Sequence, residues 1–172
     1  MKIKPAILFK QEIENNMHEL FYSQEMFYVS GSNYNFVPEI KERESYGVDS
    51  VFQYAVTSAD DTGEKVVGYI QFSVDWYSKC AYNWAVVSFD RGNTAIAKAL
   101  LELLNRCFDE YALHRIEWKM VGGNPVERGY DNALNYFKKK GFLTSKHVFK
   151  DSLKDKSGKY RDSIIFEIIK GV

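Results

Sequence analysis

The sequence predicts a single α/β (α+β) domain, residues 1–172, in which helices flank a mixed and mostly antiparallel sheet. Three observations support this prediction. Two segments with strand-like apolar alternation flank a polar turn within residues 51–75, as in a β-hairpin. A strand, a helix and a second strand follow within residues 81–121, and such a unit places its two strands in parallel. Two more strand-like segments, residues 142–150 and 160–169, form an antiparallel pair at the end of the chain.

The N-terminal region predicts one strand and two helices before the hairpin. Residues 3–9 suit a short opening strand, and apolar residues at near-helical spacing predict an amphipathic helix over residues 11–28. Pro38 suits the first turn of a short helix over residues 39–46. The aromatic side chains of this region either line a pocket or pack in the core, and they are Tyr22, Phe27, Tyr28, Tyr34 and Phe36.

The central and C-terminal elements follow from the same patterns. A helix with one apolar face is expected to end near Tyr111, and a second over residues 130–140 has Gly141 as its C-cap. The strands expected around these helices are residues 51–56, 66–75, 81–89 and 115–121.

The bulk composition is that of an ordinary globular protein, with 45% hydrophobic and 27% charged residues. Basic and acidic residues both number 23, and the zero net charge argues against a nucleic-acid partner bound through bulk positive charge. Cys80 and Cys107 form no Cys-x-x-Cys pattern, which favours a reduced, cytoplasmic setting over a disulfide scaffold. No apolar run approaches the ~18 residues of a membrane span, so we expect no membrane partner and no signal peptide.

Residues 86–104 join a strand to a Leu-rich helix through a polar turn. Asn93 or Thr94 can cap this helix, and its first positions include the small residues Ala95 and Ala97. Free N–H groups at such a helix start can bind an anion. Each hydrogen bond to a charged group contributes about 1.5–3 kcal/mol, against about 0.3–1 kcal/mol from the helix dipole. The stretch therefore predicts either an anion site built from amides or an ordinary capped amphipathic helix.

This stretch resembles the acetyl-CoA site of the GNAT superfamily of N-acetyltransferases. The family pattern, Gln/Arg-x-x-Gly-x-Gly/Ala, aligns with residues 92–97, and Ala97 lies within the pattern. Ala95 stands where the family has its first glycine, and the basic residue, Arg91, comes one place early.

Later segments resemble the family in the same order. Leu113–Val121 is similar to the next strand of the family, with Asn124 after it. Ala133–Phe142 resembles the family segment Ala-x-x-x-Tyr-x-x-x-Gly-Phe, and Gly158–Asp162 leads into a last strand as in ribosomal-protein-type N-acetyltransferases. The resemblance implies a GNAT-like sheet with a β-α-β core that binds acetyl-CoA as co-substrate between strands 81–89 and 115–121. The cofactor-binding residues that it implies are Val86, Val87, Arg91, Gly92, Asn93, Thr94, Ala95, Ile96, Ala97, Asn124 and Phe137.

In this family the acceptor amine attacks the thioester directly, without a covalent enzyme intermediate. The resemblance implies Tyr136 as the acid that protonates the departing thiolate, although the register position itself holds Phe137, and water is the alternative donor. Strand residues 81–85 carry no carboxylate. The carboxylates that remain candidates for the base are Asp75, Asp90 and Glu117, among which the sequence does not choose.

Without a base on that strand, an acceptor with a low pKa is favoured. Deprotonating a lysine-like amine at neutral pH costs about 4.6 kcal/mol, whereas an α-amine costs only about 1–1.4 kcal/mol. The sequence thus predicts an acetyl-CoA-dependent N-acetyltransferase for a small-molecule or peptide amine. The alternatives are a non-catalytic domain of the same fold that binds CoA or another ligand, or a protein-interaction domain. No metal is expected, because the three histidines and two cysteines show no ligand spacing, and a homodimer is left open.

Overall fold

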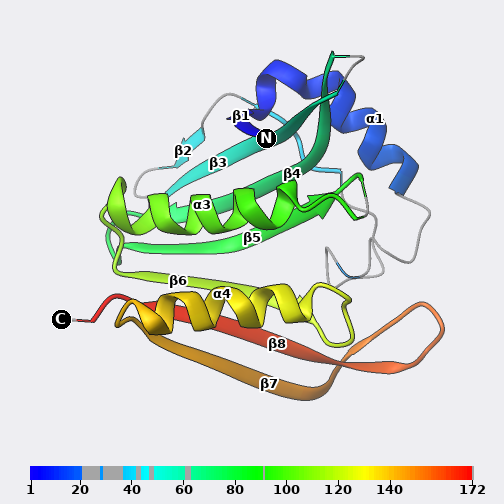
Figure 1. The fold of residues 1–172 in the computed structure, drawn as a ribbon. Helices are drawn as coiled ribbons and strands as arrows, with labels where there is room; N and C mark the ends of the chain where they lie inside the picture. Colours follow the sequence, from blue (N-terminus) through cyan, green and yellow to red (C-terminus); the bar gives the residue numbers. More distant parts are fainter. Residues whose placement is uncertain are drawn as a thin grey trace.

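One mixed sheet of eight strands organises the described part of the chain (Figure 1). The computed structural model describes residues 1–20, 28, 37–41, 44–46, 49–60, 63–90 and 92–171. The strands are β1 Lys2–Pro5, β2 Glu44–Tyr46, β3 Asp49–Asp60, β4 Gly63–Asp75, β5 Cys80–Ser88, β6 Arg115–Val121, β7 Leu143–Lys154 and β8 Tyr160–Ile169. Their order is β1-β3-β4-β5-β6-β8-β7, with β2 beside β3. Every neighbouring pair is antiparallel except β5 and β6, so the predicted mixed, mostly antiparallel sheet is confirmed.

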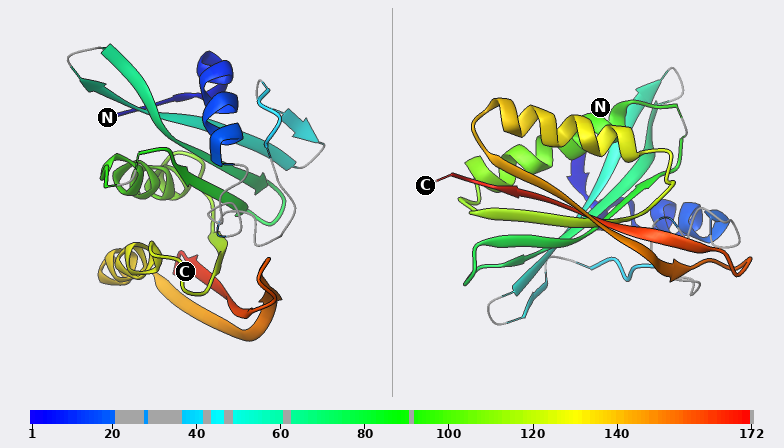
Figure 2. Two further views of the ribbon diagram at one scale, coloured as in Figure 1. Left: turned by 90° about the vertical axis from the view of Figure 1, so that its right-hand side faces the viewer. Right: turned by 90° about the horizontal axis from the view of Figure 1, so that it is seen from below.

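Helices cover both faces of the sheet. α3 (Ala95–Asp109) and α4 (Glu127–Lys139) lie on one face, and α1 (Lys10–Leu20), which follows the 3₁₀ turn η1 (Ala6–Phe9), lies on the other (Figure 2). α3 buries the apolar face that the sequence predicts, and its C-terminal part packs through Leu103, Leu104 and Phe108. None of the helices in the described ranges is both long enough and apolar enough to cross a membrane.

Two apolar cores result from this layering. The larger lies between the sheet and helices α3 and α4, and it contains several stacked ring pairs. Phe72 stacks on Trp84 at 4.3 Å, and Trp118 stacks on Phe166 at 5.3 Å. The smaller core lies under α1 and includes the fully buried Tyr69. Each large apolar side chain buried in these cores contributes about 1.5–3 kcal/mol.

Strands β5 and β6 are in contact at one end only. Their ladder consists of the pairs Cys80↔Arg115 and Ala81↔Ile116, and beyond these the strands diverge toward their C-terminal ends (Figure 1). A bulge just past this point bends β5, because the register with β4 shifts and Asn83 adopts a left-handed φ of 52°. The divergence leaves the edge of β5 that faces β6 without a partner strand.

The N-terminal region differs from the sequence expectations. The opening strand ends at Pro5, which has no N–H to continue a ladder, and the 3₁₀ turn η1 follows. The expected helix over residues 39–46 is wrong, because Glu44–Tyr46 pairs with β3 as strand β2 and this pairing overrides local helix propensity. The expected helix over residues 11–28 is confirmed for α1, and Tyr28 is helical. Tyr22, Phe27, Tyr34, Phe36 and the rest of residues 21–27 lie outside the described residues.

Candidate functional site

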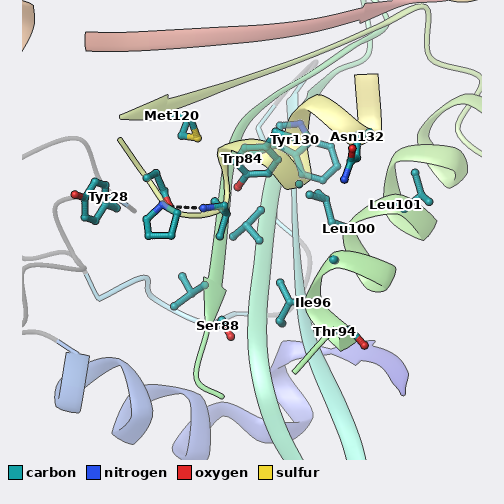
Figure 3. A pocket seen from close by; sticks show the side chains of 18 of the residues that line it. Tyr28, Trp84, Ser88, Thr94, Ile96, Leu100, Leu101, Met120, Tyr130 and Asn132 are labelled. Atoms are coloured by element: carbon teal, nitrogen blue, oxygen red, sulfur yellow. Dashed lines mark hydrogen bonds between the residues drawn. The ribbon is translucent and has the colours of Figure 1, made fainter. Parts of the chain in front are cut away.

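A cleft of about 730 Å³ opens where β5 and β6 diverge, beneath the first turns of α3 and α4 (Figure 3). Its wall is mostly apolar, which is typical of small-molecule sites. The side of β5 and α3 contributes Trp84, Val86, Val87, Ser88, Gly92, Asn93, Thr94, Ile96, Ala97, Lys98, Leu100 and Leu101. The opposite side contributes Lys119, Met120, Asn124, Pro125, Val126, Gly129, Tyr130, Asn132 and Ala133, and Leu20 and Tyr28 complete the described lining.

The start of α3 presents backbone amides to this cleft. Asn93 provides the side-chain cap, since its Oδ1 accepts from the Ala95 N–H at 2.9 Å, whereas Thr94 makes no side-chain cap bond. The next two amides, those of Ile96 and Ala97, have no hydrogen-bond partner among the described residues. Two free amides at a helix start beside a cleft can bind an anion.

Two glycines bring α3 to this position. Gly92 enters the helix with a φ of 90°, a conformation that side chains other than glycine rarely adopt. Gly68 on β4 lets the helix approach the sheet, because a Cβ at that position would lie 1.8 Å from Ile96 Cδ1 and 2.6 Å from the Val87 carbonyl oxygen. The sequence prediction missed Gly68, whose role depends on a contact with a residue 28 positions later.

Backbone groups also line the floor of the cleft. β5 pairs with β4 through Val86 and Val87, which lie opposite Ile70 and Tyr69. Because peptide groups alternate in direction along a strand, every second residue of β5 points its N–H and C=O away from β4. Past Ala81 no β6 partner receives them. A ligand that carries amide groups can therefore pair with this edge.

Asn124 forms the opposite wall, ahead of α4. Its Oδ1 accepts from the Val126 N–H at 3.1 Å, the dashed line in Figure 3, and its carbonyl oxygen accepts from the Glu127 N–H at 3.0 Å. These bonds fix the loop that enters α4 and leave the side-chain NH₂ of Asn124 as the donor at the cleft. The structure thus brings Asn124 to the same cleft as the α3 amides.

Most of the residues implied as cofactor-binding meet in this cleft. Those that line it are Val86, Val87, Gly92, Asn93, Thr94, Ile96, Ala97 and Asn124. Ala95 lies behind the wall, 6% exposed, where its small size lets the first turn pack against the sheet. Arg91 lies outside the described residues.

Phe137 and Tyr136 are not among the residues that line the cleft. Phe137 is 1% exposed and packs against Phe108 and Phe142 in the core. The Tyr136 hydroxyl donates to Asn105 Oδ1 at 3.4 Å, toward the C-terminal half of α3. One helical step of about 100° separates the two side chains, and neither of them faces the cleft.

Tyr130, which the sequence prediction missed, supplies a hydroxyl at the cleft. Its ring packs against Trp118 at 5.7 Å and Phe166 at 5.5 Å, and burial raises the pKa of its phenol to about 12. The group is therefore a neutral donor at pH 7. The sequence places Tyr130 two helical turns before Phe137 on the same face of α4, but only the structure shows that the cleft opens beside the first turn of that face.

The described lining contains no carboxylate and no histidine, and its ionisable side chains are Tyr28, Lys98, Lys119 and Tyr130. The three carboxylates considered from the sequence are engaged elsewhere. Asp75 accepts from the backbone and hydroxyl of Ser78, which lowers the pKa of its carboxyl. Asp90 accepts from Asn93 at 3.2 Å, and Glu117 pairs with Arg115 at 2.6 Å. Across the described ranges, no group of three or more potential metal ligands is assembled.

No protein-family model and no curated protein matches the sequence. Among solved structures, a provisionally named phosphinothricin N-acetyltransferase aligns over 99% of both chains, with a TM-score of 0.63 and 17% identity. RimJ from Mycobacterium smegmatis, solved with CoA-disulfide, aligns over 69% of this chain and 53% of its own, with a TM-score of 0.47 and 22% identity. The spermidine/spermine N-acetyltransferase SpeG from Vibrio cholerae aligns over 72% and 66%, with a TM-score of 0.48 and 15% identity.

The chain spans less than two thirds of the length of RimJ and SpeG, so the fold assignment rests on the alignment that covers both chains. The chain therefore has the fold of the GNAT N-acetyltransferases.

Proposed function

We propose that the protein is an N-acetyltransferase that uses acetyl-CoA as co-substrate. The proposal rests on three features that line one cleft. They are the free amides of Ile96 and Ala97, the unpaired edge of β5, and the Tyr130 hydroxyl. CoA carries matching groups in the same order along its length, namely a pyrophosphate, two amides and a sulfur.

The residues present fit such a ligand. The pyrophosphate would accept hydrogen bonds from the Ile96 and Ala97 amides, with the Lys98 ammonium nearby on the same turn. The methyl group of Ala97 leaves these amides accessible, as the glycine or alanine of the family pattern does. The pantetheine amides would pair with β5 at Val86, since the backbone of Val87 is directed toward β4, and the Asn124 NH₂ would contribute from the opposite wall.

The chain's own groups then act on the reaction. The amine nitrogen forms a bond to the acetyl carbonyl carbon, the carbon–sulfur bond breaks, and the thiolate leaves. Tyr130 gives its phenolic proton to that thiolate. The new amide nitrogen releases a proton to solvent, and Tyr130 takes up a proton from solvent in turn. A pKa near 12 keeps the phenol protonated until the thiolate forms.

The acceptor that suits this cleft is an uncharged amine of low pKa. Since no described lining residue is a carboxylate or histidine, the amine must arrive deprotonated, which favours α-amino or aryl amines near neutral pH. Lys119 and Lys98 also disfavour a polycationic acceptor and favour one that carries an anionic group. The provisional name of the aligned structure, a phosphinothricin N-acetyltransferase, is consistent with a small amine acceptor.

A second candidate is a protein of the same fold that binds CoA without turnover, which the lack of a described base in the cleft favours. The two candidates separate in one experiment. Purified protein is mixed with acetyl-CoA and a panel of α-amino, aryl and ε-amino acceptors, and free thiol is measured over time. Thiol release that depends on both substrates supports the transferase. Acetyl-CoA binding in calorimetry with no release by any acceptor supports the binding protein.

The free state of Cys80 and Cys107 suits the reducing cytoplasm, where we place the reaction.

A further inference from the structure

The cleft has an open end and a closed end. The open end lies at the C-terminal ends of β5 and β6, and the closed end lies where the two strands pair at Ala81↔Ile116. Trp84 is three residues past Ala81, about 10 Å along the strand. Figure 3 places Trp84 and Tyr130 close together at one end of the cleft, and Ser88 and Thr94 at the other.

The indole of Trp84 is held firmly at this closed end. Its ring stacks on Phe72 with a centroid distance of 4.3 Å and an interplanar angle of 16°, and only 9% of the residue is exposed. The bulge at Asn83 sets the direction of the side chain, because it shifts the register of β5 just before Trp84. A ring that is stacked and almost fully buried cannot swing away to admit a larger ligand.

The indole N–H is an unused donor. Trp84 Nε1 is buried and has no hydrogen-bond partner among the described residues. A buried donor without an acceptor is unfavourable. No hydrogen bond to a described residue therefore holds the ring, and the stacking on Phe72 fixes its position.

We propose that the Trp84 indole is the end wall of an acyl pocket and limits the donor to acetyl-CoA and its shortest homologues. The inference rests on the proposed function. A pantetheine arm anchored at the Ile96 and Ala97 amides and paired with β5 at Val86 directs its sulfur, and the acyl group beyond it, toward Trp84. Trp84 is a specificity-determining residue in this arrangement, distinct from Tyr130, which supplies the proton.

The test compares the kcat/KM values for acetyl-, butyryl- and hexanoyl-CoA in the wild type and in Trp84→Ala, with the best acceptor of the wild type. Removing the indole leaves an apolar space of the kind that takes up small hydrocarbons. Each newly buried methylene favours the longer donor about fourfold, so the butyryl-to-acetyl ratio should rise about 15-fold in Trp84→Ala. Trp84→Phe keeps a ring at the end wall but removes the N–H, so its ratio should stay within about threefold of the wild type.

The matched control is Leu101→Ala, which also enlarges the cleft but from α3 rather than from the end wall. Its ratio should not change. An unchanged ratio in a folded Trp84→Ala, or an equal shift in Leu101→Ala, overturns the proposal. If Trp84→Ala does not fold, Trp84→Leu replaces it with the same expected direction, and an unchanged ratio there overturns the proposal equally.

Failure of the proposed function is distinguishable from failure of this inference. If the wild type binds acetyl-CoA but releases no thiol, calorimetric affinities replace kcat/KM, and the same 15-fold shift in the butyryl-to-acetyl ratio is expected for Trp84→Ala. If the wild type binds none of the three acyl-CoAs, the proposed function fails, and the acyl pocket fails with it.

Discussion

Helices α3 and α4 both begin at the cleft, but they contribute to it in different ways. α3 presents backbone N–H groups at its first turn, through Ile96 and Ala97, whereas α4 presents a side chain, Tyr130. A backbone site tolerates substitutions that keep the residue small, such as Ala95 where the family pattern has glycine. A side-chain site depends on register, because one residue turns a side chain by about 100° around the helix. The sequence therefore named residues at the start of α3 that line the cleft, whereas the residue that it named on α4, Tyr136, does not line it.

The largest expected effect tests the side chain that α4 contributes to the cleft. Tyr130→Phe removes one hydroxyl from the cleft while its ring still packs against Trp118 and Phe166. Since positioned acids contribute about 10²–10⁴ in rate, kcat should fall about 100-fold with acetyl-CoA affinity nearly unchanged. Steady-state kinetics and calorimetry measure the two quantities. A kcat within twofold of the wild type would leave water as the proton donor.

The pH dependence of kcat gives a second view of the same hydroxyl. Burial raises the pKa of Tyr130 to about 12, so the protonated form that donates is present below that value and is lost only above it. As the pH rises from 6, the rate should increase as the acceptor amine deprotonates and should then stay level through pH 10. A decrease in rate between pH 8 and 10 would indicate that a different acid, with a lower pKa, protonates the thiolate.

The position of the backbone amides at the start of α3 depends on the close approach of α3 to β4. Gly68→Ala places a Cβ 2.6 Å from the Val87 carbonyl oxygen, a contact that backbone cannot relieve without moving. Overpacking of this kind costs about 1–3 kcal/mol of the free energy of unfolding, and acetyl-CoA affinity should fall with it. Denaturant unfolding and calorimetry measure the two losses. Gly129→Ala on α4, where a Cβ would meet no atom within 4 Å, is the matched control and should be at least as stable as the wild type, because alanine favours a helix more than glycine does.

The anion site itself is tested by charge. Ala97→Glu places a carboxylate beside the amides that would hold the pyrophosphate, and acetyl-CoA affinity should fall at least tenfold, a loss of about 1.4 kcal/mol. Ala97→Ser adds an uncharged side chain at the same position and should retain most of the affinity. Isothermal calorimetry on both variants decides whether the α3 amides bind CoA, and equal affinities for Ala97→Glu and the wild type would place the ligand elsewhere.

The difference between local patterns and contacts of distant residues explains how much of the molecule the sequence predicted. The hairpin of β3 and β4, the β-α-β unit and the final hairpin follow from local periodicity, and all three are confirmed. Features that depend on contacts between distant residues did not show in local patterns. They include the pairing of Glu44–Tyr46 with β3, the approach of Ile96 to Gly68, and the bulge that directs Trp84 into the cleft. Tyr130 lies between these cases, since its helical face was readable once Phe137 was recognised as a core residue.

The smallest expected effect concerns Tyr136, the second tyrosine of α4. Its hydroxyl donates to Asn105 Oδ1 at 3.4 Å, and the Lys140 ammonium, 4.6 Å from its ring centroid, donates to the same oxygen at 2.9 Å. Asn105 thus keeps a partner when the hydroxyl is removed. Tyr136→Phe should therefore leave kcat within twofold of the wild type and lower the free energy of unfolding by no more than about 1 kcal/mol.

Tyr136→Phe and Tyr130→Phe remove the same atom from the same helix, six residues apart, so each is the control for the other. If Tyr136 were the acid, as the family resemblance implied, its loss would lower kcat at least tenfold and the loss of Tyr130 would not. Steady-state kinetics on the two variants side by side assigns the proton donor. Because a six-residue step leaves the two side chains on different faces of α4, only one of them can reach a sulfur held between β5 and β6.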